Sequence, residues 1–175
     1  MIKIALNNFI AGAGKDDCAD YLVEKHGFVK YAFADGIYKI AHEVYGIHEK
    51  ERPLLHHIGE SLREYDKLVW IKETLRRINR DGHERVVITD TRKLIEHAYL
   101  LEHGWENVMI YCDPKTAIER LKKRDKVVDE DLVLNSNLEN QLRPLKDHMR
   151  TIDNSDDFKE TTKELDALVK FLETN

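Results

Sequence analysis

Short apolar runs alternate with stretches of helical periodicity along most of the chain. A brief run rich in β-forming residues predicts a strand, and apolar residues recurring at i, i+3, i+4 and i+7 predict a helix with one buried face. We expect strands at 2–6, 29–33, 86–90, 108–112 and near 151–153. We expect helices at about 15–26, 37–44, 53–80 with an interruption at Gly59, 93–103, from 114, and from 157 to the end.

Residues typical of helix ends support these boundaries. Gly27 and Gly82 follow the last periodic residues of two helices, where a left-handed backbone conformation favours glycine. Asp35 and Asp113 stand where a carboxylate accepts from the first free amides of a helix, and Asp157 opens a D-x-x-E capping pattern. These positions therefore predict helix starts and stops.

One region lacks a convincing period. Residues 125–135 are highly charged, and we interpret them as a mobile cover rather than a regular element. Leu138 and Leu142 then suggest a further helix, which Pro144 must break or restart because proline cannot donate a backbone hydrogen bond.

Five short strands that alternate with helices predict an α/β fold. We expect a three-layer αβα domain spanning residues 1–175, with a five-stranded, mainly parallel sheet. Ligands of such sheets bind beyond the carboxyl ends of the strands. This rule predicts one edge that carries residues 8–16, Asp35, Asp90, Arg92 and the turn after Cys112.

Composition and charge exclude several classes of function. The chain has 175 residues, 42% of them hydrophobic, and a formal net charge of −5, which argues against a general nucleic-acid or membrane-surface binder. Its two cysteines form no metal or disulfide spacing, so we expect thiols in a reducing cytoplasm. No apolar run approaches the ~18 residues of a membrane span, and we expect a protein that is neither exported nor anchored.

The loop after the first strand has the layout of a phosphate-binding loop. Glycines allow successive amides to face an anion, the helix N-terminus adds partial positive charge, and Lys15 can reach the outer phosphates. Phe9 stands where G-x-x-x-x-G-K-[ST] has its first glycine, and Asp16 stands at the hydroxyl position. A carboxylate can bind Mg²⁺ in place of a hydroxyl. The alternative is a tight turn at Gly12 and Gly14 without a ligand.

Four segments together resemble the deoxynucleoside monophosphate kinases of phage and bacterial type, which are P-loop nucleotide kinases. The segments are Gly14-Lys15-Asp16; Phe33-Ala34-Asp35 with Lys39; Ile58-Gly59 with Arg63 and Trp70; and Thr89-Asp90-Thr91-Arg92 with Glu96. The likeness covers nearly the whole chain in order. In that family GKD replaces GKS or GKT, while Phe9 and Asp17 depart from the family pattern.

The resemblance implies a kinase that uses ATP and Mg²⁺ to convert a (deoxy)nucleoside monophosphate to the diphosphate. Phosphoryl transfer needs in-line positioning and positive charge, and a phosphate acceptor with a second pKa near ~6 needs no general base. Residues 36–80 would form a helical substrate-binding region, and residues 120–137 a lid. The predicted ATP-binding residues are Ala11, Gly12, Ala13, Gly14, Lys15, Asp16, Asp17 and Asn154.

Several residues have a predicted role in ligand binding and, as an alternative, a purely structural role. Arg92 and Arg63, with Lys39 as a further candidate, would hold the acceptor phosphate, but Arg63 could instead pair with Asp66 or Glu60. Asp90 would orient Mg²⁺ through water, or cap the following helix.

Arg120 and Arg124 lie four residues apart on one helix face and would contact the transferring phosphates after lid closure, which excludes water as a competing acceptor. Their alternative role is a solvated basic helix end. Asp35 would contact the acceptor or its sugar, or only cap its helix. Trp70 would bound a base pocket or pack in the core, as would Tyr31 and Phe33.

The same residues are compatible with other functions. Animal-type phosphomevalonate kinases also combine GKD with a strand ending in Asp-Thr-Arg, as Asp90-Thr91-Arg92 does here. A sugar or nucleoside kinase needs a base near its hydroxyl acceptor, for which Asp35 is the available carboxylate. Phe9 in the loop also allows a nucleotide-binding protein without turnover. We expect small-molecule nucleotides as partners, and a monomer or homodimer.

Overall fold

A computed structural model describes residues 1–125, 127–135 and 141–174. The chain divides into two compact units, one formed by Met1–Lys30 with Glu84–Asn175 and the other by Tyr31–His83. The elements in chain order are β1 (Ile2–Asn7), α1 (Lys15–His26), β2 (Val29–Tyr31), α2 (Ala34–Tyr45), α3 (Arg52–Tyr65), α4 (Val69–Asp81), β3 (Arg85–Thr91), α5 (Leu94–Glu102), β4 (Glu106–Tyr111), α6 (Pro114–Arg124), α7 (Glu130–Asn135), the 3₁₀ helix η2 (Arg143–His148), β5 (Arg150–Asp153) and α8 (Phe158–Thr174).

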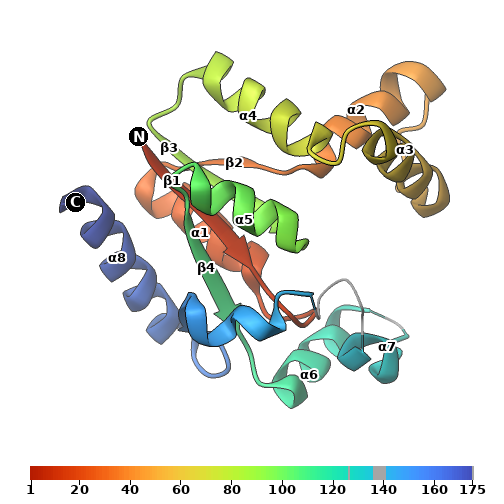
Figure 1. The fold of residues 1–175 in the computed structure, drawn as a ribbon. Helices are drawn as coiled ribbons and strands as arrows, with labels where there is room; N and C mark the ends of the chain where they lie inside the picture. The colour runs from red at the N-terminus through yellow and green to blue at the C-terminus, as the bar shows by residue number, and fades with distance from the viewer. Residues whose placement is uncertain (126, 136–140, 175) are drawn as a thin grey trace. The chain divides into compact units, whose positions relative to one another are not determined.

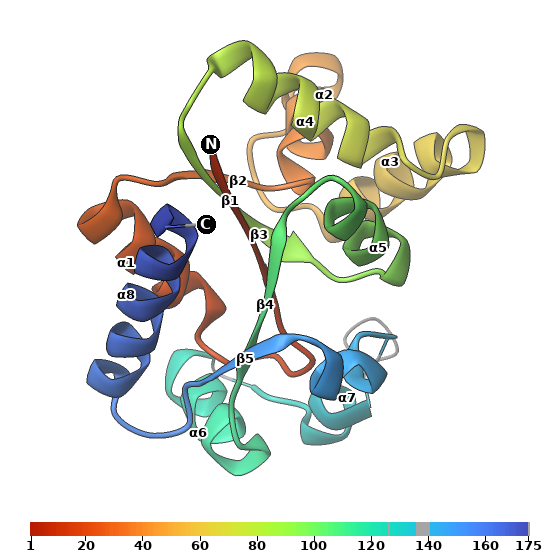
Figure 2. The same ribbon diagram turned by 60° about the vertical axis from the view of Figure 1, so that its left-hand side comes forward.

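The first unit is built on a parallel sheet. Its strand order is β2-β3-β1-β4-β5, and β1 pairs in parallel with both β3 and β4, while β4 pairs in parallel with β5. Helices α1 and α8 cover one face of the sheet and α5 covers the other (Figures 1 and 2). The predicted three-layer α/β architecture is therefore confirmed.

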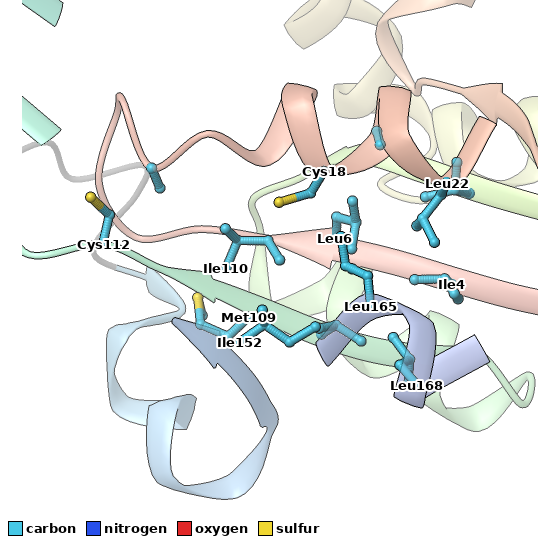
Figure 3. Packing of buried hydrophobic residues seen from close by; sticks show 14 of the residues in the cluster. Ile4, Leu6, Cys18, Leu22, Met109, Ile110, Cys112, Ile152, Leu165 and Leu168 are labelled. Atoms are coloured by element: carbon cyan, nitrogen blue, oxygen red, sulfur yellow. The ribbon is translucent and has the colours of Figure 1, made fainter. Parts of the chain in front are cut away.

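The hydrophobic core of this unit lies between the sheet and helices α1 and α8 (Figure 3). Alternate residues of β1 point into it because side chains along a strand alternate between faces. Fully buried members include Ile4, Leu6, Cys18, Leu22 and Leu165. Burial raises the pKa of the Cys18 thiol to about 12, so this cysteine packs as an unreactive apolar side chain.

The predicted caps are largely confirmed. Gly27 and Gly82 end their helices in the left-handed conformation, with φ of 68° and 70°. The Asp113 carboxylate accepts from the amides of Lys115 and Thr116, as an N-cap should.

The prediction that Asp35 caps its helix is wrong. Phe33 is the N-cap of α2, and Asp35 lies within the first turn. Its carboxylate accepts from the amide of Ala32 at 3.0 Å, three residues toward the N-terminus. The aspartate thus folds back on the preceding turn instead of capping the amides ahead of it.

The predicted interruption at Gly59 is also wrong. Helix α3 continues through Gly59, and the chain breaks between Asp66 and Leu68 instead. There the Asp66 carboxylate accepts from the Leu68 amide at 2.9 Å, which competes with helical bonding. Gly59 is buried, and a Cβ on it would lie 3.2 Å from Cδ1 of Ile37, so glycine serves close helix packing here.

The charged stretch at 125–135 contains more order than predicted. Its second half forms the short helix α7, although no periodicity announced it. Leu138 lies outside the described residues, as do positions 126, 136 and 137 of the predicted lid. Pro144 lies in the 3₁₀ helix η2, and the helix expected around Leu138 and Leu142 falls partly outside the described residues, so it stays a prediction.

The second unit consists of helices α2, α3 and α4. It contains residues 36–80, where helices are predicted; their role in substrate binding stays a prediction. Among the described residues, no helix is long and apolar enough to span a membrane.

Candidate active site

The loop between β1 and α1 is shaped by two glycines. Gly12 and Gly14 have φ of 85° and 81°, a conformation that residues with a Cβ rarely adopt. A Cβ on Gly12 would lie 2.6 Å from the carbonyl oxygen of Ala117, and one on Gly14 would lie 2.2 Å from Nδ2 of Asn154. Only glycine fits at these two positions, immediately before the N-terminus of α1.

Phe9 supports the start of this loop from the core. Its side chain is 7% exposed, and its ring centroid lies 5.8 Å from that of Tyr111. The guanidinium of Arg143 lies over the Phe9 ring, 5.6 Å from its centroid. The residue that replaces the first glycine of the motif is therefore a buried anchor of the loop.

Lys15 lies between the loop and the end of β3. Its Nζ donates to the carbonyl oxygen of Thr89 and to Oδ1 of Asp16, the latter at 3.0 Å. The Lys15 side chain is only 10% exposed. Contact with a phosphate would exchange one of these bonds for a phosphate oxygen.

Asp16 presents a charged carboxylate at the start of α1. Partial burial raises its pKa, but the charge and hydrogen bond of Lys15, together with the charges of Lys30 and Arg92, hold the pKa below its ordinary value. The side chain is 77% exposed. A carboxylate that stays ionised at neutral pH and faces solvent suits a Mg²⁺ ion.

The donor set fits Mg²⁺ bound with a nucleotide rather than a closed metal cage. Within the described ranges, no group of three or more His, Cys, Asp or Glu side chains could hold a metal. Mg²⁺ typically uses one or two carboxylates, waters and substrate phosphates. Asp16 and the partly buried Asp90 near the end of β3 can supply those carboxylates, and Asp17, next to Asp16 in sequence, is exposed.

Asn154, one of the predicted ATP-binding residues, supports the glycine loop from within the protein. It is 2% exposed, and its Nδ2 donates to the carbonyl oxygen of Ala13 at 2.8 Å. Its Oδ1 accepts from the hydroxyl of Thr161 at 2.9 Å. This amide braces the glycine loop from the end of β5. Sequence reasoning missed that role, because only the fold brings residues 13 and 154 together.

The two arginines of α6 differ in their hydrogen-bond partners. Nη1 of Arg120 donates to the carbonyl oxygen of Asn154 at 2.7 Å, so this guanidinium is tied to the turn after β5. Arg124 binds both oxygens of Asp125, at 3.0 and 2.8 Å, and is 68% exposed. The hydrogen bond to Asp125 raises the pKa of Arg124, burial lowers it, and the charges of Asp125 and Asp16 raise it further. Arg124 is therefore close enough to the loop to interact with Asp16.

Arg92 is the least engaged cation near the loop. Its side chain is exposed, and it makes no hydrogen bond or ion pair with any other residue that the structure describes. The backbone amides of Arg92 and Lys93 both donate to Oε2 of the buried Glu96, at 2.9 Å each. Glu96 thus fixes the backbone turn that carries Arg92.

The predicted substrate residues of the second unit have partners of their own. Nη1 of Arg63 donates to Oε1 of Glu60 at 2.6 Å, which confirms the alternative ion pair. Lys39 lies 3.9 Å from Oε1 of Glu43 and is 64% exposed. Trp70 is 3% exposed, and its indole donates to the carbonyl oxygen of Gly59 at 3.0 Å, so core packing accounts for it.

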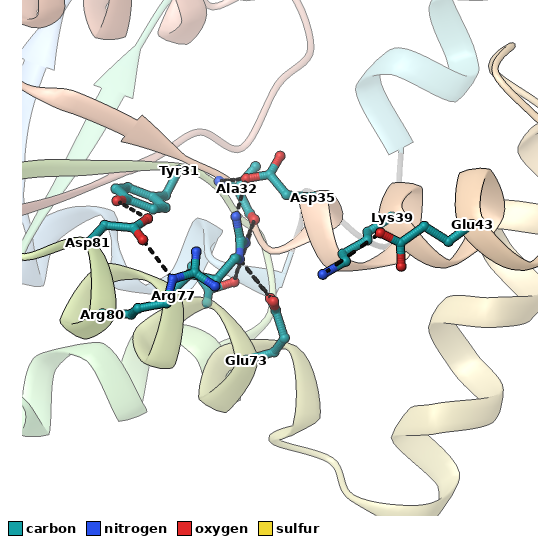
Figure 4. Close-up of polar contacts among 10 residues, drawn as sticks. Tyr31, Ala32, Asp35, Lys39, Glu43, Glu73, Arg77, Arg80 and Asp81 are labelled. Carbon is teal, nitrogen blue, oxygen red and sulfur yellow. Dashed lines mark hydrogen bonds and ion pairs between the residues drawn. The ribbon is translucent and has the colours of Figure 1, made fainter.

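Asp35 belongs to a polar cluster that sequence reasoning did not include (Figure 4). Arg77 of α4 donates from Nη1 to Oδ2 of Asp35 at 2.9 Å and from Nε to Glu73 at 3.0 Å. The sequence signal available for Arg77 was its i, i+4 spacing from Glu73.

Within the first unit, the fold therefore gathers the glycine loop, Lys15, Arg92 and Arg124 around Asp16. Arg120 lies on the same side but is held by Asn154. Asp35, Lys39, Arg63 and Trp70 belong to the second unit.

Comparison with known proteins supports the fold. The sequence model of a family described as an AAA domain matches residues 10–143. A search of curated proteins finds no match.

Solved structures share the architecture over nearly the whole chain. A gluconokinase from Sinorhizobium meliloti 1021 is 19% identical, with a TM-score of 0.58 over 99% of this chain and 94% of its own. TT1252 from Thermus thermophilus is 16% identical, with a TM-score of 0.63 over 98% of this chain and 97% of its own. Deoxyadenosine kinase from M. mycoides, solved with dCMP and dCDP, is 15% identical, with a TM-score of 0.53 over 97% and 100%.

Proposed function

Because the chain belongs to the AAA-domain family and folds like P-loop kinases, we propose that it transfers phosphate from ATP to a (deoxy)nucleoside monophosphate, giving the diphosphate. One observation carries the proposal. Two glycines in left-handed conformation precede Lys15 at the head of α1, with an ionised carboxylate and an exposed arginine beside them.

The donor nucleotide would bind at the glycine loop. Amides at the N-terminus of α1 favour the anion, and Lys15 would exchange its bond to the Thr89 carbonyl for a phosphate oxygen. Asp16 and Asp90 would hold Mg²⁺, which, when bound, neutralises charge on the phosphates. Asn154 keeps the loop in shape for this task.

The acceptor phosphate needs cations more than a base. Its second pKa near ~6 makes it largely a dianion at pH 7, so the protein must offset the repulsion between two anions. Arg92 presents an exposed guanidinium with no hydrogen bond or ion pair among the described residues, which suits bidentate phosphate binding. Lys39 and Arg63 are further candidates, and Arg124 would stabilise the transferring group once released from Asp125.

A second candidate keeps the fold and changes the acceptor. The gluconokinase neighbour and the exposed carboxylate of Asp35 favour a small alcohol such as a sugar acid, for which Asp35 would be the base. Asp90-Thr91-Arg92 likewise keeps phosphomevalonate as a candidate acceptor. Binding without turnover is the remaining alternative.

A coupled assay of ADP production distinguishes these functions. The protein would be incubated with Mg·ATP and, separately, each ribo- and deoxyribonucleoside monophosphate, phosphomevalonate and gluconate. We expect turnover that depends on one or more monophosphates. Turnover with only phosphomevalonate or gluconate would contradict the nucleotide proposal, and no turnover beside saturable ATP binding would support binding alone.

The proposal extends to the substrate class, cellular location and oligomeric state of the protein. A net charge of −5 supports a small phosphorylated substrate rather than nucleic acid or a membrane surface. We propose that the protein acts in the cytoplasm as a monomer or homodimer.

A further inference from the structure

Arg77 is a largely buried arginine whose guanidinium forms hydrogen bonds only with residues of the second unit, among the residues described. Its side chain is 19% exposed. Besides its bonds to Asp35 and Glu73, it donates from Nη2 to the carbonyl oxygen of Ala32 at 2.9 Å and to the Thr74 hydroxyl at 3.1 Å. Burial lowers the pKa of Arg77, but the two carboxylates raise it above its ordinary value, so the group is always charged.

The carboxylate of Asp35 is held on one side only. Its Oδ2 accepts from Nη1 of Arg77 and from the amide of Ala32, at 2.9 and 3.0 Å. Its Oδ1 has no partner in the described part of the chain, and the side chain is 46% exposed. One oxygen is therefore fixed within the protein, and the other faces solvent in a set orientation (Figure 4).

Close packing of α2 against α4 makes this contact possible. A Cβ on Gly36 would lie 2.9 Å from Cζ3 of Trp70 and 3.0 Å from Oε2 of Glu73. The bare backbone at Gly36, next to Asp35, thus allows α4 to approach. Trp70 is itself fixed by its bond to the Gly59 carbonyl. Both partners of the Asp35–Arg77 pair consequently sit on rigid helices.

The cluster also determines which chemistry it can recognise. Arg77 faces two carboxylates, Asp35 and Glu73, so the exposed end of the cluster carries an excess of negative charge. A carboxylate accepts hydrogen bonds and repels phosphate. The group that Oδ1 of Asp35 would bind is therefore a hydrogen-bond donor, such as a hydroxyl or amino group.

Holding α2 and α4 together does not by itself account for the Asp35–Arg77 ion pair. Well-packed apolar side chains join helices as well as a buried ion pair does, because charges cost desolvation free energy. What the arginine adds is a fixed direction for one exposed carboxylate oxygen.

We propose that Arg77 is a positioning residue for acceptor binding: it orients Asp35 so that Oδ1 accepts a hydrogen bond from a hydroxyl or amino group of the monophosphate. The inference rests on the proposed function. It adds that Asp35 recognises the sugar or base part of the acceptor.

The test compares Arg77→Gln and Arg77→Lys with Arg76→Gln, a control at an exposed arginine of the same helix. Kinetics are measured with Mg·ATP and whichever of the eight common ribo- and deoxyribonucleoside monophosphates the wild type turns over best. We expect the acceptor KM to rise about 10- to 100-fold in Arg77→Gln, as for loss of a charge-assisted hydrogen bond, while the KM for ATP stays within about twofold. Arg77→Lys should rescue little, because lysine lacks the planar fork. Arg76→Gln should behave as wild type.

A double-mutant cycle with Asp35→Asn separates positioning from stability. If Arg77 acts through Asp35, Arg77→Gln should change kcat/KM for the acceptor less than about threefold in the Asp35→Asn background. An equal loss in both backgrounds would overturn the inference, as would a lowered melting temperature with an unchanged acceptor KM. A wild type that is inactive with all eight monophosphates would instead overturn the proposed function, and this inference with it.

Discussion

The glycine loop owes its shape to neighbours that occupy the space a side chain would need. Asn154 lies where a Cβ on Gly14 would be, and this amide is bonded on both sides, to Ala13 and Thr161. It cannot swing away without losing buried hydrogen bonds. The loop and the turn after β5 are therefore mutually locked.

We predict that Gly14→Ala is more destabilising than Gly27→Ala. Both glycines have positive φ, at 81° and 68°, so both variants carry the cost of a left-handed alanine, about 1–2 kcal/mol. Only Gly14 adds a clash, since no atom lies within 4 Å of a Cβ on Gly27. Overpacking adds about 1–3 kcal/mol, which should lower the melting temperature by roughly 2–10 °C more. Equal melting temperatures in the two variants would contradict the locked loop.

Lys15→Ala should remove activity and preserve the fold. The ammonium is the one loop cation, and removing a single preorganised charge typically costs about 100- to 1,000-fold in kcat. Lys25→Ala, at an exposed lysine of the same helix, is the control. Circular dichroism and the coupled assay would be run on both. Wild-type kcat in Lys15→Ala would show that the loop does not bind the transferred phosphate.

Single residues were also where sequence reasoning had its limits. The roles of Asn154 and Arg77 depend on contacts across 141 and 42 positions of the chain, which no local pattern encodes. Asp35 has the right chemistry for an N-cap, yet its carboxylate bonds backward to Ala32. Lys15, Asp16 and Arg92 could be proposed from the sequence because each belongs to a short local motif.

At the scale of elements, periodicity and end signals located most helices and strands. Helix α1 begins and ends where predicted, and β3 is longer than predicted by one residue at each end. Gly59 misled the prediction because glycine weakens a helix in isolation, whereas here it allows α3 to pack closely. The helix α7 was not predicted because its six residues are too few to show a helical period.

Helix α5 buries a histidine whose titration should affect stability. His97 is 8% exposed, and burial lowers its pKa more than the neighbouring Asn107 side chain raises it. The unfolded chain therefore takes up the proton first as the pH falls. Stability should be constant above about pH 6.5 and decrease below it, by at most about 1.4 kcal/mol per pH unit.

The measurement is urea unfolding of wild type, His97→Gln and His57→Gln between pH 7.5 and 5.5. His57 is exposed on α3 and serves as the control. We expect His97→Gln to flatten the pH dependence and His57→Gln to retain it. A full wild-type slope in His97→Gln would assign the effect to other groups.

At the scale of the whole molecule, the alternation of strands and helices was sufficient to predict a parallel, three-layer α/β fold. The division into two compact units was not predicted as such, because composition does not change at residues 31 and 83. The acceptor cannot be read from the fold either, since similar folds occur in a gluconokinase and a deoxyadenosine kinase.

Separate residues should control the two substrates. Arg92→Ala is expected to raise the acceptor KM about 10- to 100-fold, as for a lost charge-assisted hydrogen bond, and to leave the KM for ATP within about threefold. Arg80→Ala, an exposed arginine paired with Asp81, is the control. Steady-state kinetics with each substrate varied in turn gives both constants. If Arg92→Ala raised only the KM for ATP, this would contradict the acceptor role and assign Arg92 to the ATP site.

The most direct measurement follows the γ-phosphate itself. Wild-type protein and Lys15→Ala would be incubated with γ-labelled ATP, Mg²⁺ and each nucleoside monophosphate, and the products separated. We predict labelled nucleoside diphosphate with at least one acceptor for the wild type and none for Lys15→Ala. Label that stays in ATP or appears only as free phosphate, whatever monophosphate is added, would contradict a nucleotide kinase built on this loop.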